Sequence, residues 1–391
     1  MKNRPANRQD RRDFLKTAGV GLGAAALSGS VAPSSLARTL APSGKTKHVV
    51  LIAFAGGVRS KETIGMPENA PNLARIASAG VVCPNVAAQN VGHYGAALSI
   101  FTGSSEVFGI RENARSENPT VFEYLRKSHG LSANSVWLST TGGNQQVNYS
   151  HGTHKDFGGR FGANLISPDG VFNAEFKNIV EEFGTPKVPS QGEADTSTRL
   201  RGMLDGGALG GQQIESDAES LRNVEEFILK EISGQTTNLT GPGASDAKAV
   251  RIATNILRVF RPTLLGIALN QHDTAHGSYN GYTEIIRRND QEIGALYDAI
   301  QADPELRDST AIMILPEFGR DADLNERNGL DHGDGSEDLG KVAMVGWGPD
   351  FRSGKVVKDS YKTIDVCPTI CSMFRVRPEY SKGRVMRGIL A

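Results

Sequence analysis

The chain has 391 residues, and its 43 Lys and Arg residues balance 43 Asp and Glu residues. A balanced charge provides no general attraction for a phosphate backbone or an acidic membrane surface, so nucleic acid is not an expected partner. The three cysteines, Cys83, Cys367 and Cys371, cannot all pair within one chain. Because Cys367 and Cys371 lie four apart on a predicted helix, where a disulfide has poor geometry, we expect small buried thiols instead.

The first 37 residues have the pattern of a twin-arginine signal peptide. Arg11-Arg12-Asp13-Phe14-Leu15-Lys16 precedes a weakly apolar stretch over residues 17–32 and a small-residue site at Ser35-Leu36-Ala37. The apolar stretch is too short and too rich in Gly and Ser for a lasting span. We therefore expect the twin-arginine machinery to export a mature protein without a membrane anchor to the periplasm or beyond.

Residues 45–391 predict one α/β domain, because short apolar runs alternate with helical patterns. The run from His48 to Phe54 is continuously apolar, as in a strand buried on both faces, and ends in Ala55-Gly56-Gly57. A helix is expected from Asn72 to Ser78 after Pro71, with a strand from Val81. Further strands are expected over residues 135–139, 264–270, 310–315 and 342–347, and a helix over 282–301. This alternation predicts a mostly parallel sheet covered on both faces.

Residues 142–243 differ from the rest, being rich in Gly, Ser, Asn and Gln. A helical pattern over residues 219–232 interrupts this composition. We interpret the region as an inserted cap or loop system over the site. For residues 185–213 a disordered linker is an equally good interpretation.

Four segments in the C-terminal half carry most of the polar chemistry. They are L-N-Q-H-D-T-A-H, ending at His276, L-P-E-F-G-R, ending at Arg320, G-L-D-H-G, ending at Gly333, and T-I-D-V-C-P-T, ending at Thr369. The first three place carboxylates and imidazoles in loops that follow apolar runs. Parallel-sheet enzymes build metal or anion sites in this way.

In their order, these segments resemble those of the alkaline phosphatase superfamily, and within it the sulfatase-like, twin-arginine-exported proteins that carry E-F-G-R and D-H-G. The resemblance spans nearly the whole mature chain. It includes the first strand with its Gly turn, P-N-L-A-R-I-A-S-A-G-V, and the run to F-T-G at Gly103. It implies an alkaline-phosphatase-like, mostly parallel sheet sandwiched by helices.

Three departures from the superfamily pattern affect one of its two metal sites. Ala55 or Gly56 stands where the superfamily has a metal-binding Asp after the first strand, and His93 stands where it has a Ser, Thr or modified Cys nucleophile. Glu317-Phe318 replaces the usual Asp-His pair. This metal site is therefore expected to be dismantled or rebuilt.

The residues at the other metal site are closer to the superfamily pattern. The resemblance assigns Asp273, His276 and His332 as ligands, with His272 as a substitute because the first spacing is one residue short. Two imidazoles and a carboxylate suit a divalent metal, zinc above all, although manganese, calcium or iron are alternatives. In the structural alternative, His272 and His276 cap loops and His332 binds a buried carboxylate.

Glu317 and Asp331 are the next candidates, each as an added metal ligand or a general base. Salt bridges to Arg320 or Arg59 are the alternative for both carboxylates. Arg320 is a candidate clamp for an anionic phosphate or sulfate.

Structural roles remain open for Arg320 and His93. Arg320 would pair with Asp321 or Asp323 in a purely structural role. His93 has three interpretations, which are a metal ligand that completes a new site with Glu317, a structural residue at the start of a helix, and a nucleophile.

Two hypotheses follow for the function. The first is an exported metal-dependent hydrolase of small anionic phosphate or sulfate esters, with one ion at Asp273, His276 and His332. The second is a non-catalytic binding or assembly protein that retains the fold.

Overall fold

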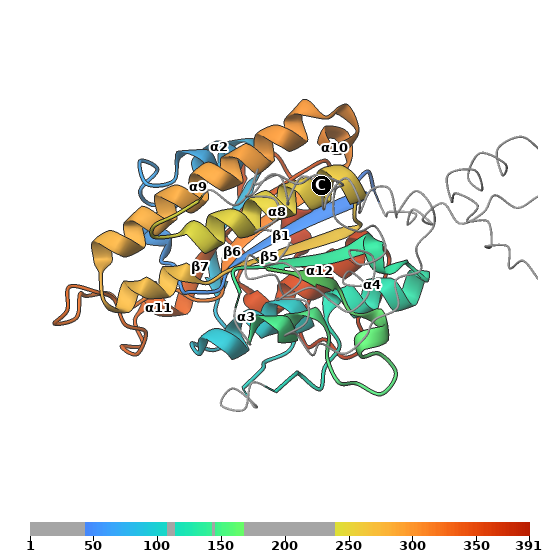
Figure 1. Ribbon diagram of the computed structural model, residues 1–391, viewed down its shortest axis with the longest axis horizontal. Coiled ribbons are helices and arrows are strands. Elements are labelled where there is room, and N and C mark those ends of the chain that lie inside the picture. Colours follow the sequence, from blue (N-terminus) through green and yellow to red (C-terminus); the bar gives the residue numbers. More distant parts are fainter. Residues whose placement is uncertain (1–43, 108–113, 143–144, 168–238) are drawn as a thin grey trace, which may run out of the picture. The chain divides into compact units, whose positions relative to one another are not determined.

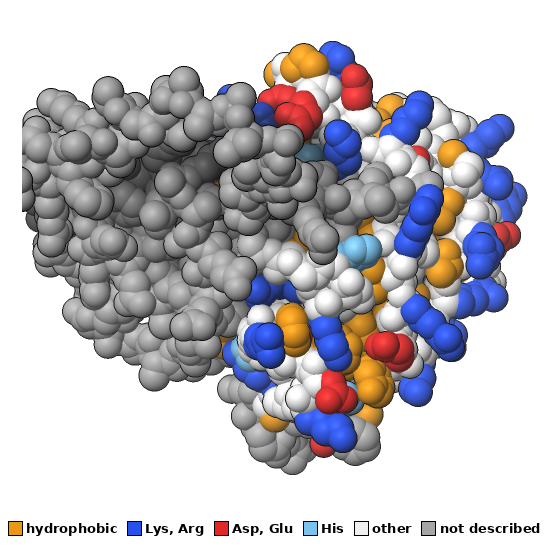
Figure 2. Space-filling view, turned by 90° about the vertical axis from the view of Figure 1, so that its right-hand side faces the viewer, with side chains coloured by type: hydrophobic (Ala, Val, Ile, Leu, Met, Phe, Trp, Pro, Cys, Tyr) orange, Lys and Arg blue, Asp and Glu red, His pale blue; other side chains and the backbone are white. Residues whose placement is uncertain are grey.

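A computed structural model describes residues 44–107, 114–142, 145–167 and 239–391. The predicted signal peptide and most of the predicted cap, including residues 219–232, lie outside the described residues. Within the described ranges, no helix is both long enough and apolar enough to cross a membrane. Figure 2 shows one face of the described part, on which Lys and Arg side chains are more frequent than Asp and Glu side chains.

A single nine-stranded sheet forms the centre of the described chain (Figure 1). Its strand order is β4-β3-β5-β1-β6-β7-β2-β8, and β9 pairs with β2. Strands β4, β3, β5, β1 and β6 run parallel, whereas β7 is antiparallel to β6 and β2. The strands are β1 (His48–Phe54), β2 (Val81–Ala87), β3 (Val136–Thr140), β4 (Asn164–Ile166), β5 (Leu264–Leu269), β6 (Thr310–Pro316), β7 (Lys341–Trp347), β8 (Lys355–Val356) and β9 (Tyr361–Lys362). The predicted mostly parallel sheet is confirmed.

Helices cover both faces of the sheet (Figure 1). One face carries α2 (Pro71–Ala79), α8 (Ala244–Phe260), α9 (Tyr279–Ala302) and α10 (Pro304–Ser309), and the other carries α3 (His93–Thr102), α4 (Val121–His129) and α12 (Val366–Met373). The helix predicted over residues 282–301 begins earlier, because the Ser278 side chain accepts a hydrogen bond from the amide of Gly281 and caps it. The short helix α11 (Glu337–Gly340) precedes β7.

Among the described residues, seven short 3-10 segments connect these elements. They are η1 (Ser60–Glu62), η2 (Ala133–Ser135), η3 (Gln146–Ser150), η4 (Gly159–Phe161), η5 (Gln271–His276), η6 (Thr363–Asp365) and η7 (Arg387–Ile389). Two of them, η3 and η5, contribute side chains to the site described below.

Strand β1 supplies side chains to two cores, one on each face of the sheet. Val49, Leu51 and Ala53 join the core under α3, α4 and α12, whereas the alternate residues Val50 and Ile52 join the core under α2, α8 and α9. A strand buried on both faces must be apolar throughout, which explains the continuous run in the sequence. The three cysteines are free and buried.

A polar network ties the start of α8 to the end of β5. The Asp246 carboxylate accepts hydrogen bonds from Thr141 Oγ1 at 2.5 Å, Asn289 Nδ2 at 2.8 Å and the amide of Asn270 at 3.2 Å. It is fully buried. The network holds the chain in place where β5 passes into η5.

Gly266 in β5 gives a direct test of core packing. A methyl group at this position would lie 2.8 Å from the Phe122 ring and 3.1 Å from Leu138. We expect Gly266→Ala to lower the free energy of unfolding by about 1–3 kcal/mol, because both neighbours are buried. Denaturant unfolding would measure the change. The control Gly340→Ala, which meets nothing within 4 Å, should stay within about 0.5 kcal/mol of the wild type.

Asp246 predicts a pH dependence of stability. Burial raises the pKa of its carboxyl group from 3.8 to about 6, although Thr141 and Asn289 donate to the anion and oppose the shift. At Asp246 the folded chain therefore binds more protons than the unfolded chain between these pKa values, and the contribution of this group to the free energy of unfolding falls as pH rises through this window. His272, 3.8 Å away, has its pKa lowered from 6.5 to about 3 by burial and so contributes a slope of opposite sign, which makes a comparison with a variant of Asp246 necessary.

Asp246→Asn should remove this slope. Relative to the wild type, the variant should gain roughly 3 kcal/mol of unfolding free energy between pH 4 and pH 7. Unfolding curves of both proteins at several pH values would measure the difference. A difference in unfolding free energy between the two proteins that does not change with pH would contradict the raised pKa of Asp246.

Candidate metal centre

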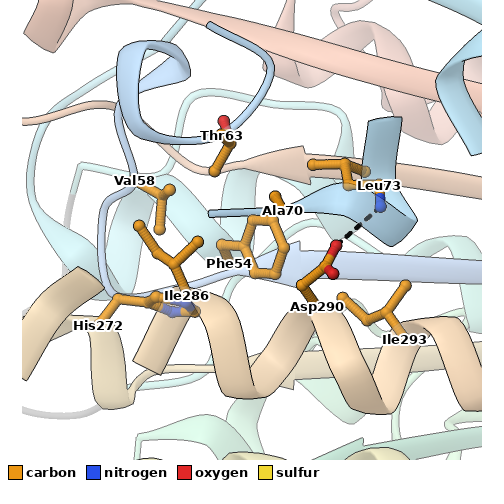
Figure 3. Close-up of a pocket in the computed structure, with 9 residues that line it drawn as sticks. All are labelled: Phe54, Val58, Thr63, Ala70, Leu73, His272, Ile286, Asp290 and Ile293. Atoms are coloured by element: carbon orange, nitrogen blue, oxygen red, sulfur yellow. Dashed lines mark hydrogen bonds between the residues drawn. The ribbon is translucent and has the colours of Figure 1, made fainter. Parts of the chain in front are cut away.

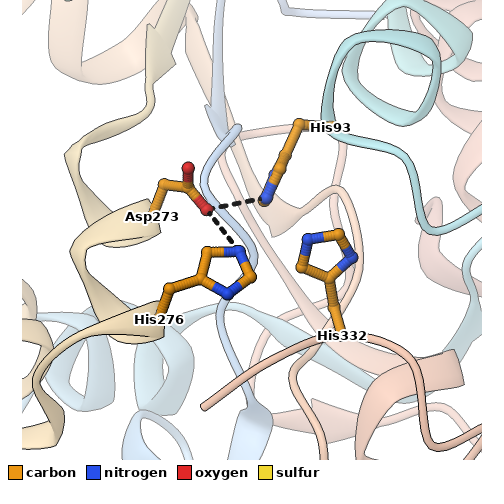
Figure 4. Close-up of side chains that lie close together, drawn as sticks. All are labelled: His93, Asp273, His276 and His332. Carbon is orange, nitrogen blue, oxygen red and sulfur yellow. Dashed lines mark ion pairs between the residues drawn. The ribbon is translucent and has the colours of Figure 1, made fainter. Parts of the chain in front are cut away.

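Four side chains from three segments of the chain gather at the carboxyl edge of the parallel strands (Figure 4). They are His93, Asp273, His276 and His332, and one ligand atom from each lies within 4.8 Å of those of the others. His93 is the first residue of α3, Asp273 and His276 belong to η5 after β5, and His332 lies in the loop between β6 and α11.

The 3-10 geometry of η5 places Asp273 and His276 side by side. Such a helix has three residues per turn, so side chains three apart point the same way. Oδ1 of Asp273 lies 3.3 Å from Nε2 of His276. The spacing that is one residue shorter than the superfamily pattern therefore still directs both side chains to one point.

Each of two histidines in the centre is held by a carboxylate. His93 Nδ1 lies 2.5 Å from Oε1 of Glu317, and His276 Nδ1 lies 2.6 Å from Oδ1 of Asp331. The Nε2 atom of His93 lies 2.8 Å from Oδ1 of Asp273 but is buried without an aligned hydrogen bond among the described residues. Carboxylates hold metal-binding imidazoles in this way, with the second nitrogen free to bind.

His332 completes the group as a third imidazole. Its ring centre lies 4.7 Å from that of His93 and 4.9 Å from that of His276. Burial, followed by the positive charge of His93, lowers the pKa of His332 below its ordinary value. Its neutral ring is the form that binds a metal.

The electrostatics of the centre favour a positive charge between Glu317 and Asp273. Burial lowers the pKa of His93, but the Glu317 and Asp273 carboxylates outweigh it and raise the value to about 9. Burial raises the pKa of Glu317 to about 6 against the opposing effect of His93. Burial would likewise raise the pKa of Asp273, yet His93 and Arg320 hold it well below its usual range. A divalent cation would supply positive charge at the same place.

Arg320 supports Asp273 from inside the protein. Its side chain is fully buried and donates to the carbonyl oxygens of Gly56, Gly57 and Leu330 and, at 2.7 Å, to Oδ1 of Asp273. This placement favours a structural role over the anion clamp, because the guanidinium does not face solvent. Its acidic partner is Asp273 rather than Asp321 or Asp323.

The glycine turn after β1 makes room for this guanidinium. Gly57 has a φ of 64°, and a Cβ atom there would lie 2.9 Å from Nε of Arg320. Only glycine adopts this conformation readily while allowing such a close approach.

Glu317 and Asp331 do not form the alternative salt bridges to Arg320 or Arg59, because each arginine pairs with another carboxylate. Arg320 pairs with Asp273. Arg59 pairs with the buried Glu62. Asp331 has a second contact with Arg327, at 3.2 Å. Glu317 and Asp331 thus contact imidazoles of the centre and lie one hydrogen bond behind its ligand atoms.

His272 lies apart from the centre. It is buried, and its ring centre lies 5.1 Å from that of Phe54. Figure 3 shows it at a cavity of about 10 Å³ with Val58, Ile286 and Asp290. The structure therefore gives no support to His272 as a substitute ligand.

A larger cavity of about 290 Å³ adjoins the centre on the side of β3 and β5. Besides His93 and Asp273, it is lined by Ala55, Gly142, Gln145, Gln146, Tyr149 and Asn270. Sequence reasoning did not single out Gln145, Gln146 or Tyr149, because these residue types in a Gly-rich segment carry no chemical signature.

No protein-family model matches the chain, and no curated protein is similar to it in sequence. Solved structures are similar in fold. Wild-type alkaline phosphatase PafA matches with a TM-score of 0.55 and 10% identity, covering 90% of this chain and 99% of its own. A PafA mutant gives 0.56 and 10%, covering 89% and 99%.

Weaker matches include the lipoteichoic acid synthase LtaP from Listeria monocytogenes, with a TM-score of 0.47 and 9% identity over 87% of this chain and 74% of its own. At such low identities the PafA likeness shows the fold alone. The chain has the mixed α/β fold of alkaline phosphatase, with helices on both faces of a mostly parallel sheet.

Proposed function

We propose that this protein is a metal-dependent hydrolase of phosphate or sulfate esters that works with one divalent cation. The observation that carries the proposal is the pair of carboxylate-held histidines, His93 on Glu317 and His276 on Asp331, with both Nε2 atoms beside Asp273. A fold shared with the alkaline phosphatase PafA supports the reaction class by analogy.

The donor set fits a divalent metal. His93, His276 and His332 would offer imidazole nitrogens and Asp273 a carboxylate oxygen. Three imidazoles favour zinc, iron or manganese over calcium, which prefers oxygen ligands. When bound, such a cation polarises an ester oxygen and makes water a better nucleophile at neutral pH.

The surrounding residues would keep these donors in place. Glu317 and Asp331 fix the orientation of two imidazoles, and Arg320 keeps Asp273 ionised. His93 has one nitrogen on Glu317 and the other beside Asp273, which argues against a covalent intermediate on its ring. Attack by water is the reaction that this arrangement supports.

The substrate in this proposal is a small anionic ester, and the twin-arginine pattern supports a reaction outside the cytoplasm. A non-catalytic binding protein would have no need for two carboxylate-held imidazoles beside a shared acid. The two hypotheses are therefore separated by measuring whether the protein holds a metal ion and whether it hydrolyses esters.

Metal content tests the donor set directly. Elemental analysis of the mature protein should find about one tightly held zinc, manganese or iron ion per chain. His332→Ala should lose it, because one of four donors is removed, whereas His154→Ala, outside the cluster, should retain it. Wild-type protein that holds no ion after incubation with each metal would refute the proposal.

Glu317→Gln tests whether Glu317 orients His93. Loss of such a carboxylate should weaken metal affinity by roughly 10–100-fold while leaving turnover measurable at saturating metal. Asp331→Asn should have a smaller effect, because Asp331 is 41% exposed and water can replace it. Complete loss of turnover with unchanged affinity in Glu317→Gln would instead make Glu317 the general base.

A further inference from the structure

Tyr149 brings a phenol to the cavity of about 290 Å³ that adjoins the candidate metal centre. The residue belongs to η3, and the same cavity is lined by two of the proposed metal ligands, His93 and Asp273. Ala55 and Asn270, which follow β1 and β5, also line it, so the cavity lies at the carboxyl edge of the sheet. An ester bound by the metal ligands would therefore lie at this cavity.

The ring of Tyr149 is fixed in the hydrophobic core. It stacks on the ring of Tyr94, with 5.8 Å between ring centres, and on the ring of Phe101, with 5.5 Å. Both neighbours belong to α3, the helix that begins at His93. The direction of the phenol is thus set by the same helix that carries a proposed metal ligand. A group held in this way needs no reorganisation when a ligand binds.

The hydroxyl group of Tyr149 has no protein partner and is accessible. Only 3% of the residue is exposed, and the hydroxyl makes no hydrogen bond with a described residue. Nevertheless, its oxygen is not among the enclosed atoms without a partner, unlike Oε1 of Gln146. Because the oxygen is neither bonded nor enclosed, it reaches the open space of the cavity that Tyr149 lines. A buried tyrosine usually has a hydrogen-bond partner, so this arrangement favours a ligand that supplies one.

The anionic oxygen atoms of the proposed substrate are suitable partners. No Lys or Arg is among the described residues that line the cavity, and Arg320, the expected anion clamp, is bonded to backbone carbonyl groups and Asp273. Burial, followed by the charge of Glu317, raises the pKa of Tyr149 well above its ordinary value, so the phenol stays protonated and can donate. A charged oxygen atom accepts strongly and cannot donate.

We propose that Tyr149 is a catalytic residue that donates a hydrogen bond to a charged, non-bridging oxygen of the ester bound at the metal centre. The inference rests on the proposed hydrolase function. It gives that site a neutral donor for the substrate anion, in place of the guanidinium expected from the sequence.

Tyr149→Phe removes the hydroxyl group and keeps the stacked ring. Metal-loaded mature protein would be assayed with the 4-nitrophenyl and phenyl esters of phosphate and of sulfate. We expect kcat/KM to fall about 10–100-fold, the equivalent of one hydrogen bond to a charged group. The factor should be the same for both leaving groups, because the bonded oxygen does not leave. Metal content should match the wild type, since Tyr149 is not one of the four donors.

Tyr94→Phe is the matched control. Its ring belongs to the same stack, but its hydroxyl group donates to the backbone carbonyl of Ala114 rather than into the cavity. The variant should therefore unfold more easily than the wild type while its kcat/KM for the same esters stays unchanged. An equal fall of kcat/KM in Tyr94→Phe and Tyr149→Phe would overturn the proposal, because disturbed stacking would then explain both.

The remaining outcomes separate this inference from the hydrolase proposal. Unchanged kinetics in Tyr149→Phe, or a loss confined to the phenyl esters, would overturn the hydrogen bond to a non-bridging oxygen and leave the hydrolase proposal standing. If the wild type cleaves none of the esters, the hydrolase proposal fails, and calorimetric titration with inorganic phosphate and sulfate tests the hydrogen bond. Weaker binding by Tyr149→Phe than by Tyr94→Phe supports it, whereas equal affinity or no binding overturns it.

Discussion

A single oxygen atom, Oδ1 of Asp273, organises the centre of this protein. His93, His276 and Arg320 approach it from three different parts of the chain, at 2.8, 3.3 and 2.7 Å. A carboxylate surrounded by so much positive charge remains ionised, and it attracts whatever cation the neighbouring nitrogens can share. Removing this one group would leave a buried guanidinium without its acidic partner, which is costly in a protein interior.

The order of the strands in the sheet brings the groups around Asp273 together. Strands β5, β1 and β6 are adjacent and parallel, so the segments that follow them emerge at the same edge. The segment after β5 provides Asp273, the one after β1 provides the carbonyl groups of Gly56 and Gly57, and the one after β6 provides Glu317 and Arg320. Groups more than 200 residues apart in sequence thus meet without a long connection across the sheet.

Sequence patterns predict most of this fold, because strands buried on both faces need continuous apolar runs and helices need a 3.6-residue stripe. The choice of Asp273, His276 and His332 depends on the resemblance to the alkaline phosphatase superfamily, and the structure brings these three side chains together. The deep burial of Arg320 has no sequence signal, since arginine is usually exposed. Gln146 is equally hidden, because only the folded chain shows that its oxygen is buried without a hydrogen-bond partner among the described residues.

The buried guanidinium also bears on how the proposed metal centre would respond to an exchange of its ion. Arg320 is fixed by three backbone carbonyl groups, so its charge is a permanent part of the interior. In small zinc domains the ion drives folding and its removal unfolds the chain. Here an internal cation already anchors the acidic ligand, and the two large hydrophobic cores do not include the ligand residues. We therefore expect the scaffold to form without the ion, so that different metals could be compared in one folded protein.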